Sequence, residues 1–94
     1  MTPTPGHTPH HVSVVIESEG KKAIISGDFV HHPCQIANQD WGSAADTFPE
    51  QTIATRKKLL AEIKDTNTLL FGCHFANPVA GKVISTKKGL VFKI

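Results

Sequence analysis

The sequence predicts a small α+β or α/β domain in which a mixed β-sheet packs against one main helix. Three observations lead to this fold class. The chain begins with strand-like runs at 11–18 and 22–26, has one amphipathic segment at 47–64, and ends with three short apolar runs between residues 68 and 94. The order is therefore β-β-loop-α-β-β-β. A helix between the second and third strands allows a crossover connection within a mixed sheet.

The first two strands are predicted to form a hairpin over residues 11–26. Val12, Val14 and Ile16 alternate with residues that point to the other side, which is the pattern of a strand. A turn around Gly20 joins this run to the second strand. Residues 1–10 contain three prolines and one glycine, so we expect them to form a loop.

A long loop and one helix follow the hairpin. Residues 29–48 show little periodicity, and a loop of this length in a compact domain usually has a function. The helix is predicted over 47–64, with Thr47 and Glu50 as a capping box. Its apolar stripe would comprise Ile53, Leu60 and Ile63, and Arg56, Lys57 and Lys64 would lie on the other face.

The last part of the chain is predicted to add three strands. Residues 68–73 form a nearly continuous apolar run of the buried-strand type, and His74 follows it directly. The runs at 82–86 and 90–94 would form a hairpin around Lys87, Lys88 and Gly89.

The composition is that of one soluble globular domain. The net charge is +2 and the lysines are scattered in pairs, so we expect no nucleic-acid partner. No run approaches about 18 apolar residues, and the N-terminus lacks the features of a signal peptide, so we expect no membrane association. Cys34 and Cys73 lie far apart in the sequence, which favours two reduced thiols and a cytoplasmic protein over a disulfide.

Three motifs resemble those of metallo-β-lactamase-fold hydrolases. Gly6-His7-Thr8-Pro9-His10-His11 is similar to the G-H-[ST]-P-G-H segment of that family, Ser26-Gly27-Asp28 to its strand-end aspartate, and Gly72-Cys73-His74 to its last metal-binding histidine. The stretch from Gly27 to Gln35 resembles the G-D-x-x-H-H-P-x-Q sequence of the branch that includes quorum-quenching lactonases and methyl-parathion-hydrolase-like enzymes. The resemblance runs from about Gly6 to the end of the chain.

The resemblance implies a divalent metal centre, with zinc as the first expectation. By this resemblance His7 would bind one ion, His74 a second, and Asp28 would bridge the two as the central catalytic carboxylate. Neutral imidazole nitrogens and carboxylates are the ligands that such ions prefer, and a bound ion activates water for attack on a carbonyl or phosphoryl centre. His11 would support the ligands from behind. By the same resemblance His31 and His32 would line the pocket of a small-molecule substrate, and the alternative is a partly exposed pair of loop histidines. Trp41, in the same loop, would line this pocket or anchor the loop on the core.

The family's H-x-H-x-D-H cluster does not occur in the sequence. We therefore expect residues 1–94 to form a single partial domain, the C-terminal half of an αββα sandwich, without the N-terminal half. The inner face of its sheet would then be apolar and uncovered, and we expect the chain to form a homo-oligomer, a dimer in the simplest case, or to pair with a complementary N-terminal half.

Three functions remain open at this point. In the first, the chain is part of a metal-dependent hydrolase of lactones, esters or phosphotriesters, and the isolated chain is inactive. The second is a non-catalytic oligomeric binding or structural module descended from such a hydrolase. The third is a small metal-binding protein in which His7, Asp28 and His74, with His11 as a further candidate ligand, converge on a single ion.

Overall fold

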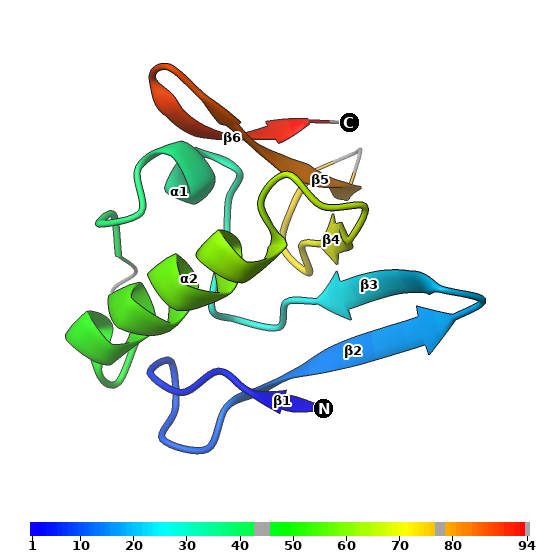
Figure 1. Ribbon diagram of the computed structural model, residues 1–94. Helices are drawn as coiled ribbons and strands as arrows, with labels where there is room; N and C mark the ends of the chain where they lie inside the picture. Colours follow the sequence, from blue (N-terminus) through cyan, green and yellow to red (C-terminus); the bar gives the residue numbers. More distant parts are fainter. Residues whose placement is uncertain (43–45, 77–78, 94) are drawn as a thin grey trace.

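The computed structural model of the protein describes residues 1–42, 46–76 and 79–93. One long helix crosses one side of a six-stranded sheet (Figure 1). The strands are β1 (Thr2–Pro3), β2 (Val12–Ser18), β3 (Lys21–Ile25), β4 (Leu69–Phe71), β5 (Ala80–Thr86) and β6 (Gly89–Lys93), and the helices are α1 (Cys34–Ala37) and α2 (Pro49–Ile63). Among the described residues, no helix is long and apolar enough to cross a membrane.

The strands lie side by side in the order of the sequence, from β1 to β6. All neighbours are antiparallel except β3 and β4, which are parallel and pair Ile24 with Leu70. Two parallel neighbours need a crossover connection, and the chain between β3 and β4 contains α2. The predicted order of two strands, loop, helix and three strands is thus confirmed, and the sheet is mixed as expected.

Two short elements were not predicted. β1 lies within the expected N-terminal loop and pairs Pro3 with Val12 of β2. Proline lacks an N–H group and is tolerated in an edge strand such as this one. α1 is a single turn within the long loop, where Cys34–Ala37 follow Pro33.

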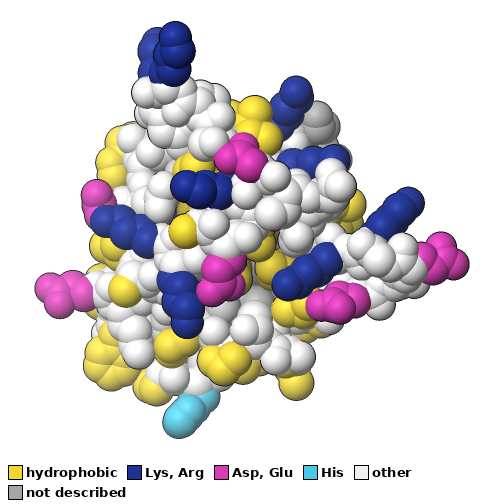
Figure 2. All heavy atoms as spheres, viewed as in Figure 1, with side chains coloured by type: hydrophobic (Ala, Val, Ile, Leu, Met, Phe, Trp, Pro, Cys, Tyr) yellow, Lys and Arg dark blue, Asp and Glu magenta, His cyan; other side chains and the backbone are white. Residues whose placement is uncertain are grey.

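The hydrophobic core lies between α2 and the sheet. Leu60 and Ile63 of α2 are buried against Ile24, Leu70 and Val83, which come from three adjacent strands. The remaining core residues are Ile36 of α1, Leu59 of α2, and Phe29, Val30 and Phe75 of the connecting segments. Charged side chains of both signs are scattered over the side of the molecule on which α2 lies (Figure 2).

The other face of the sheet is apolar and open. The alternation predicted for β2 is present, but Val12, Val14 and Ile16 point away from the core and are 42%, 40% and 50% exposed. Val15 points toward the core, where it packs on the buried cluster. Leu69 adds a further exposed apolar side chain at 36%. We refer to Val12, Val14, Ile16 and Leu69 as the open sheet face.

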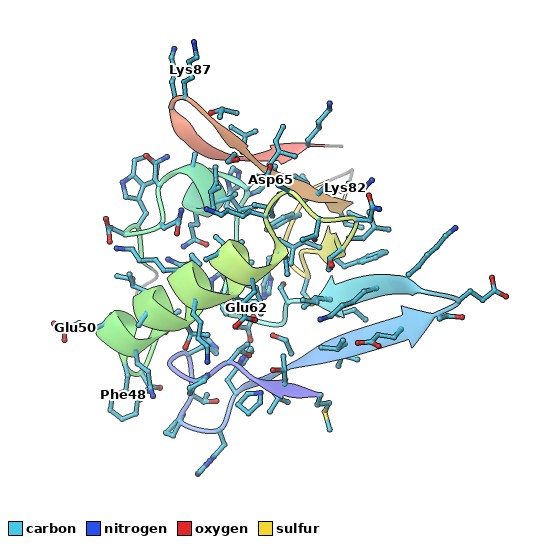
Figure 3. The ribbon with its side chains drawn as sticks, viewed as in Figure 1. Phe48, Glu50, Glu62, Asp65, Lys82 and Lys87 are labelled. Atoms are coloured by element: carbon cyan, nitrogen blue, oxygen red, sulfur yellow. The ribbon has the colours of Figure 1, made fainter. Side chains whose placement is uncertain are left out.

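Both ends of α2 are held by other parts of the chain. The predicted capping box is wrong, because the helix begins at Pro49 and its N-cap residue, Phe48, makes no side-chain cap. At the other end, Asp65 adopts a positive φ of 57° and donates its N–H group to Val83. The Asp65 carboxylate also accepts the N–H group of Ser85 at 2.9 Å, which fixes the end of the helix on β5 (Figure 3).

Candidate metal centre

Three histidine side chains surround the carboxylate of Asp28. Nε2 of His74 lies 2.5 Å from Oδ1 of Asp28, and Nε2 of His31 lies 3.6 Å from the same oxygen. Nε2 of His7 lies 3.4 Å from the other oxygen, Oδ2. The structure thus brings together His7, Asp28 and His74, which the sequence singled out as metal ligands, and adds His31 to them.

The parallel pairing of β3 and β4 places two of these residues. The carboxyl ends of parallel strands meet at the same edge of a sheet, so residues that follow the two strands become neighbours. Asp28 follows β3 and His74 follows β4. A hydrogen bond of 2.9 Å from Ser26 N–H to the Phe71 carbonyl continues the pairing beyond Ile25 and brings the two strand ends together.

The start of α2 places His7. The carbonyl oxygens of Gly6 and His7 accept the N–H groups of Phe48 and Thr47, at 2.8 and 3.0 Å. Gly6 has a φ of +135°, and a Cβ atom there would lie only 2.3 Å from the backbone nitrogen of Thr52. Only glycine therefore allows the loop to approach the helix closely enough to direct His7 toward Asp28.

His11 lies behind Asp28 and holds its backbone. Nε2 of His11 accepts the N–H group of Asp28 at 2.8 Å, so the ring hydrogen of the neutral imidazole is on Nδ1, which donates to the Thr4 carbonyl at 3.0 Å. Both ring nitrogens of His11 are thus occupied by protein atoms. A Cβ atom on Gly27 would lie 2.7 Å from Nε2 of His11, so this contact also depends on a glycine.

A chain of hydroxyl groups connects this support to the sheet. Oγ1 of Thr4 lies 2.9 Å from Oγ of Ser13, and Oγ of Ser13 donates to the Ser26 carbonyl at 2.8 Å. All three residues are buried. The hydrogen bonds fix the N-terminal segment and the end of β3 relative to each other, and with them the positions of His7 and Asp28.

The charges of the site favour an ionised carboxylate and a neutral imidazole. Partial burial raises the pKa of Asp28, but the His74 hydrogen bond and the nearby His7, His74 and His31 rings outweigh it, so the net pKa lies below its ordinary value. For His31, burial lowers the pKa, and the attraction of Asp28 offsets this only in part. An ionised Asp28 and a neutral His31 are the forms that bind metal ions.

Comparisons with known proteins identify the family. The family model of the metallo-beta-lactamase superfamily matches residues 1–74. The chain belongs to this superfamily. No curated protein matches the sequence significantly.

Three solved hydrolase structures each contain a part with the fold of this chain. The dizinc quorum-quenching lactonase AidC is 29% identical with a TM-score of 0.87, over 97% of this chain and 31% of its own. The hydrolase AbOPH of the beta-lactamase superfamily is 25% identical with a TM-score of 0.89, over 99% and 33%. A probable metal-dependent hydrolase from Staphylococcus aureus is 26% identical with a TM-score of 0.68, over 84% and 28%. The chain thus spans about a third of the length of these proteins.

The donor atoms of this superfamily member suit a divalent ion. Within the described residues, one group of ligand atoms from Asp28, His31 and His74 lies within 4.8 Å of one another. One carboxylate and two imidazoles on one centre match the chemistry of zinc and of other first-row divalent ions. Nε2 of His7 lies beside Oδ2, the other oxygen of Asp28, so the group can be extended to a second position.

The two other predicted pocket residues lie at the surface. His32 is exposed, and its Nδ1 accepts the N–H group of Cys34 at 3.0 Å. Trp41 is 57% exposed, while its backbone carbonyl accepts hydrogen bonds from the side chains of Gln35 and Arg56. Their contact with a substrate stays a prediction, as does that of His31.

Sequence reasoning missed two buried residues beside the site, Asp46 and Arg56. The side chain of Asp46 is 0% exposed, and its Oδ1 lies 3.0 Å from Nδ1 of His7. The assignment of Arg56 to the solvent face of the helix was wrong, because its side chain is 0% exposed. The helical spacing of Arg56, Leu60 and Ile63 carried the correct signal, since these positions share one face. Asp46 has no comparable signal, because it lies in a segment without periodicity.

Proposed function

We propose that the chain contributes Asp28, His7 and His74 to the metal centre of a hydrolase that acts on lactones, esters or phosphotriesters. The observation that carries this proposal is the convergence of His7, His31 and His74 on the two oxygens of Asp28. The likeness to AidC, a dizinc lactonase, and to AbOPH, a hydrolase, supports the reaction class. Zinc is the metal we propose, because the donors are imidazole nitrogens and a carboxylate.

The roles of the residues follow from their positions. When bound, the ion would supply Lewis acidity and an activated water. Asp28 presents one oxygen to His31 and His74 and the other to His7, and we propose that its carboxylate would link two metal positions. His11 holds the backbone N–H group of Asp28 and therefore the direction in which the carboxylate points. His74 is the most open of the ligands, at 54% exposure, and we propose that substrate approaches from its side.

We propose that turnover needs ligands beyond these residues. A carboxylate shared between two positions leaves each with two or three protein ligands, whereas zinc sites usually have three or four. The H-x-H-x-D-H cluster is not in the sequence, and the matched structures are about three times as long as the matched segment. The chain alone would then bind metal without rapid turnover.

The first experiment is metal binding by the purified chain. We expect elemental analysis after purification without chelator to find about one equivalent of zinc or another divalent ion per chain. His74→Ala should lower this content strongly, and His10→Ala, a change at an exposed histidine, should not. Assays with a lactone, an aryl ester and a phosphotriester would then measure turnover. A folded wild-type chain that takes up no metal when titrated with zinc would contradict the proposal.

A specific observation also favours association through the open sheet face. The resemblance implies a sandwich in which a second sheet covers this one, and four apolar side chains here are 36–50% exposed. Monomeric soluble proteins rarely leave a contiguous apolar surface of this kind uncovered. We propose that in solution the isolated chain covers this face with a second copy of itself.

Light scattering tests this association. We expect the chain to be at least dimeric at micromolar concentration, and Ile16→Lys to shift it toward the monomer. Phe48→Lys is the matched control, because Phe48 is 48% exposed but lies at the start of α2 (Figure 3). A well-folded wild-type monomer at this concentration would show that the face needs no cover.

A further inference from the structure

Asp46 is a buried acid whose main contact is with His7. Its side chain is 0% exposed, and Oδ1 lies 3.0 Å from Nδ1 of His7. Burial of an ionised carboxylate is costly unless it is paired and hydrogen-bonded. The ionisable groups near Asp46 among the described residues include His7, His31 and Arg56.

The contact with Asp46 fixes the tautomer of His7. An ionised carboxylate can only accept hydrogen bonds, so the hydrogen of a neutral His7 ring must be on Nδ1. Nε2 then carries the lone pair, and this atom lies 3.4 Å from Oδ2 of Asp28. A lone pair and a carboxylate oxygen repel each other at this distance unless a positive charge lies between them or on the ring. A cation close to both Nε2 of His7 and Oδ2 of Asp28 would therefore stabilise this arrangement.

Arg56 is a buried cation near Asp46. It is fully buried, and burial lowers the pKa of its guanidinium group, which the nearby Asp46 carboxylate offsets only in part. Its Nε donates at 2.9 Å to the carbonyl of Phe29, the residue that follows Asp28 in the sequence. Its Nη1 donates to the carbonyls of Gln39 and Trp41 at 2.9 and 2.8 Å. One side chain thus fixes the chain on both sides of the site.

We propose that Asp46 is a positioning residue of the metal centre: it holds His7 as the Nδ1–H tautomer, so that Nε2 keeps the lone pair with which it would bind a metal ion. The inference rests on the proposed function for its metal, but the tautomer itself is a property of the metal-free chain. Carboxylate partners of this kind orient a ligating histidine and raise its basicity, and their loss costs about 10- to 100-fold in metal affinity.

The test combines Asp46→Ala with a control from the same loop. Asp40→Ala removes an acid that is 78% exposed and pairs with Lys57 at the surface. The nitrogen chemical shifts of the His7 ring, measured by NMR on the metal-free chain, report the tautomer. Competition with a chelator reports the zinc affinity. We expect wild type and Asp40→Ala to show the Nδ1–H form of His7, and Asp46→Ala to lose this preference and to bind zinc about 10- to 100-fold more weakly.

A folded Asp46→Ala chain with an unchanged His7 tautomer and unchanged zinc affinity would overturn the inference. If the alanine variant does not fold, Asp46→Leu, which fills the site but has no hydrogen-bond acceptor for Nδ1 of His7, is measured by the same two readouts and judged by the same result. A wild-type chain without zinc affinity would overturn the proposed function instead, and the tautomer of His7 would still decide the role of Asp46.

Discussion

Asp28→Asn is expected to abolish stoichiometric zinc binding while leaving the fold intact. The carboxylate is the one group that contacts His7, His31 and His74 together, and an amide in its place supplies no charge. We expect the affinity to fall by more than the 10- to 100-fold that loss of a supporting partner costs. Isothermal titration with zinc measures the affinity, and circular dichroism checks the fold.

The Asp28→Asn result depends on comparison with Asp40→Asn. Both changes remove one negative charge from the chain, but Asp40 lies at the surface, where it pairs with Lys57. The Asp40 variant should bind zinc like the wild type. Similar zinc affinities for all three proteins would mean that the ion binds elsewhere, and the proposed centre would be wrong.

Arg56→Met is expected to lower the free energy of unfolding by about 3–5 kcal/mol. Methionine fills most of the volume but removes the positive charge near the buried Asp46 and the hydrogen bonds that Arg56 donates to the carbonyls of Phe29, Gln39 and Trp41. Urea unfolding at a fixed protein concentration, followed by the fluorescence of Trp41, the only tryptophan, measures the change.

Lys57→Met is the matched control for the arginine variant. Lys57 is the next residue of α2, half exposed, and its pairing with Asp40 is at the surface. Exposed ion pairs contribute about 0–1 kcal/mol, so this variant should unfold close to the wild type. A loss of less than about 1 kcal/mol in Arg56→Met would show that the buried guanidinium is not needed for stability.

Sequence patterns predict the strands and the helix well where burial on one side produces a clear period. The long helix and the strands on either side of it have such a period, and Asp28 and His74 follow directly from strand ends that share one sheet edge. The pattern in β2 was also correct, but alternation does not say which side the helix covers. Here the apolar side is open, and Ser13 is buried because its hydroxyl bonds to the Ser26 carbonyl.

The unpredicted parts depend on contacts between distant segments. Asp46 reaches His7 across 39 positions of the sequence, from a segment without periodicity, so no local pattern marks it. His31 was assigned to a pocket, since a loop histidine carries no sign of its partner until Asp28 is placed. Arg56 shares the helical spacing of the apolar stripe. A charged residue is nevertheless predicted to be solvent-exposed unless the carbonyl groups that accept its hydrogen bonds are known.

The crossover between β3 and β4 means that folding and ligand binding are coupled. Asp28 and His74 are 46 positions apart and become neighbours only when β4 pairs with β3 around the helix. Closing so long a loop costs chain entropy, and non-local pairings of this type tend to form late in folding. An ion that binds the assembled residues and not the unfolded chain stabilises the folded state by mass action. The four side chains of the site, His7, Asp28, His31 and His74, would therefore determine two properties. They would set the chemistry of the site and the fraction of chains in which the sheet is complete.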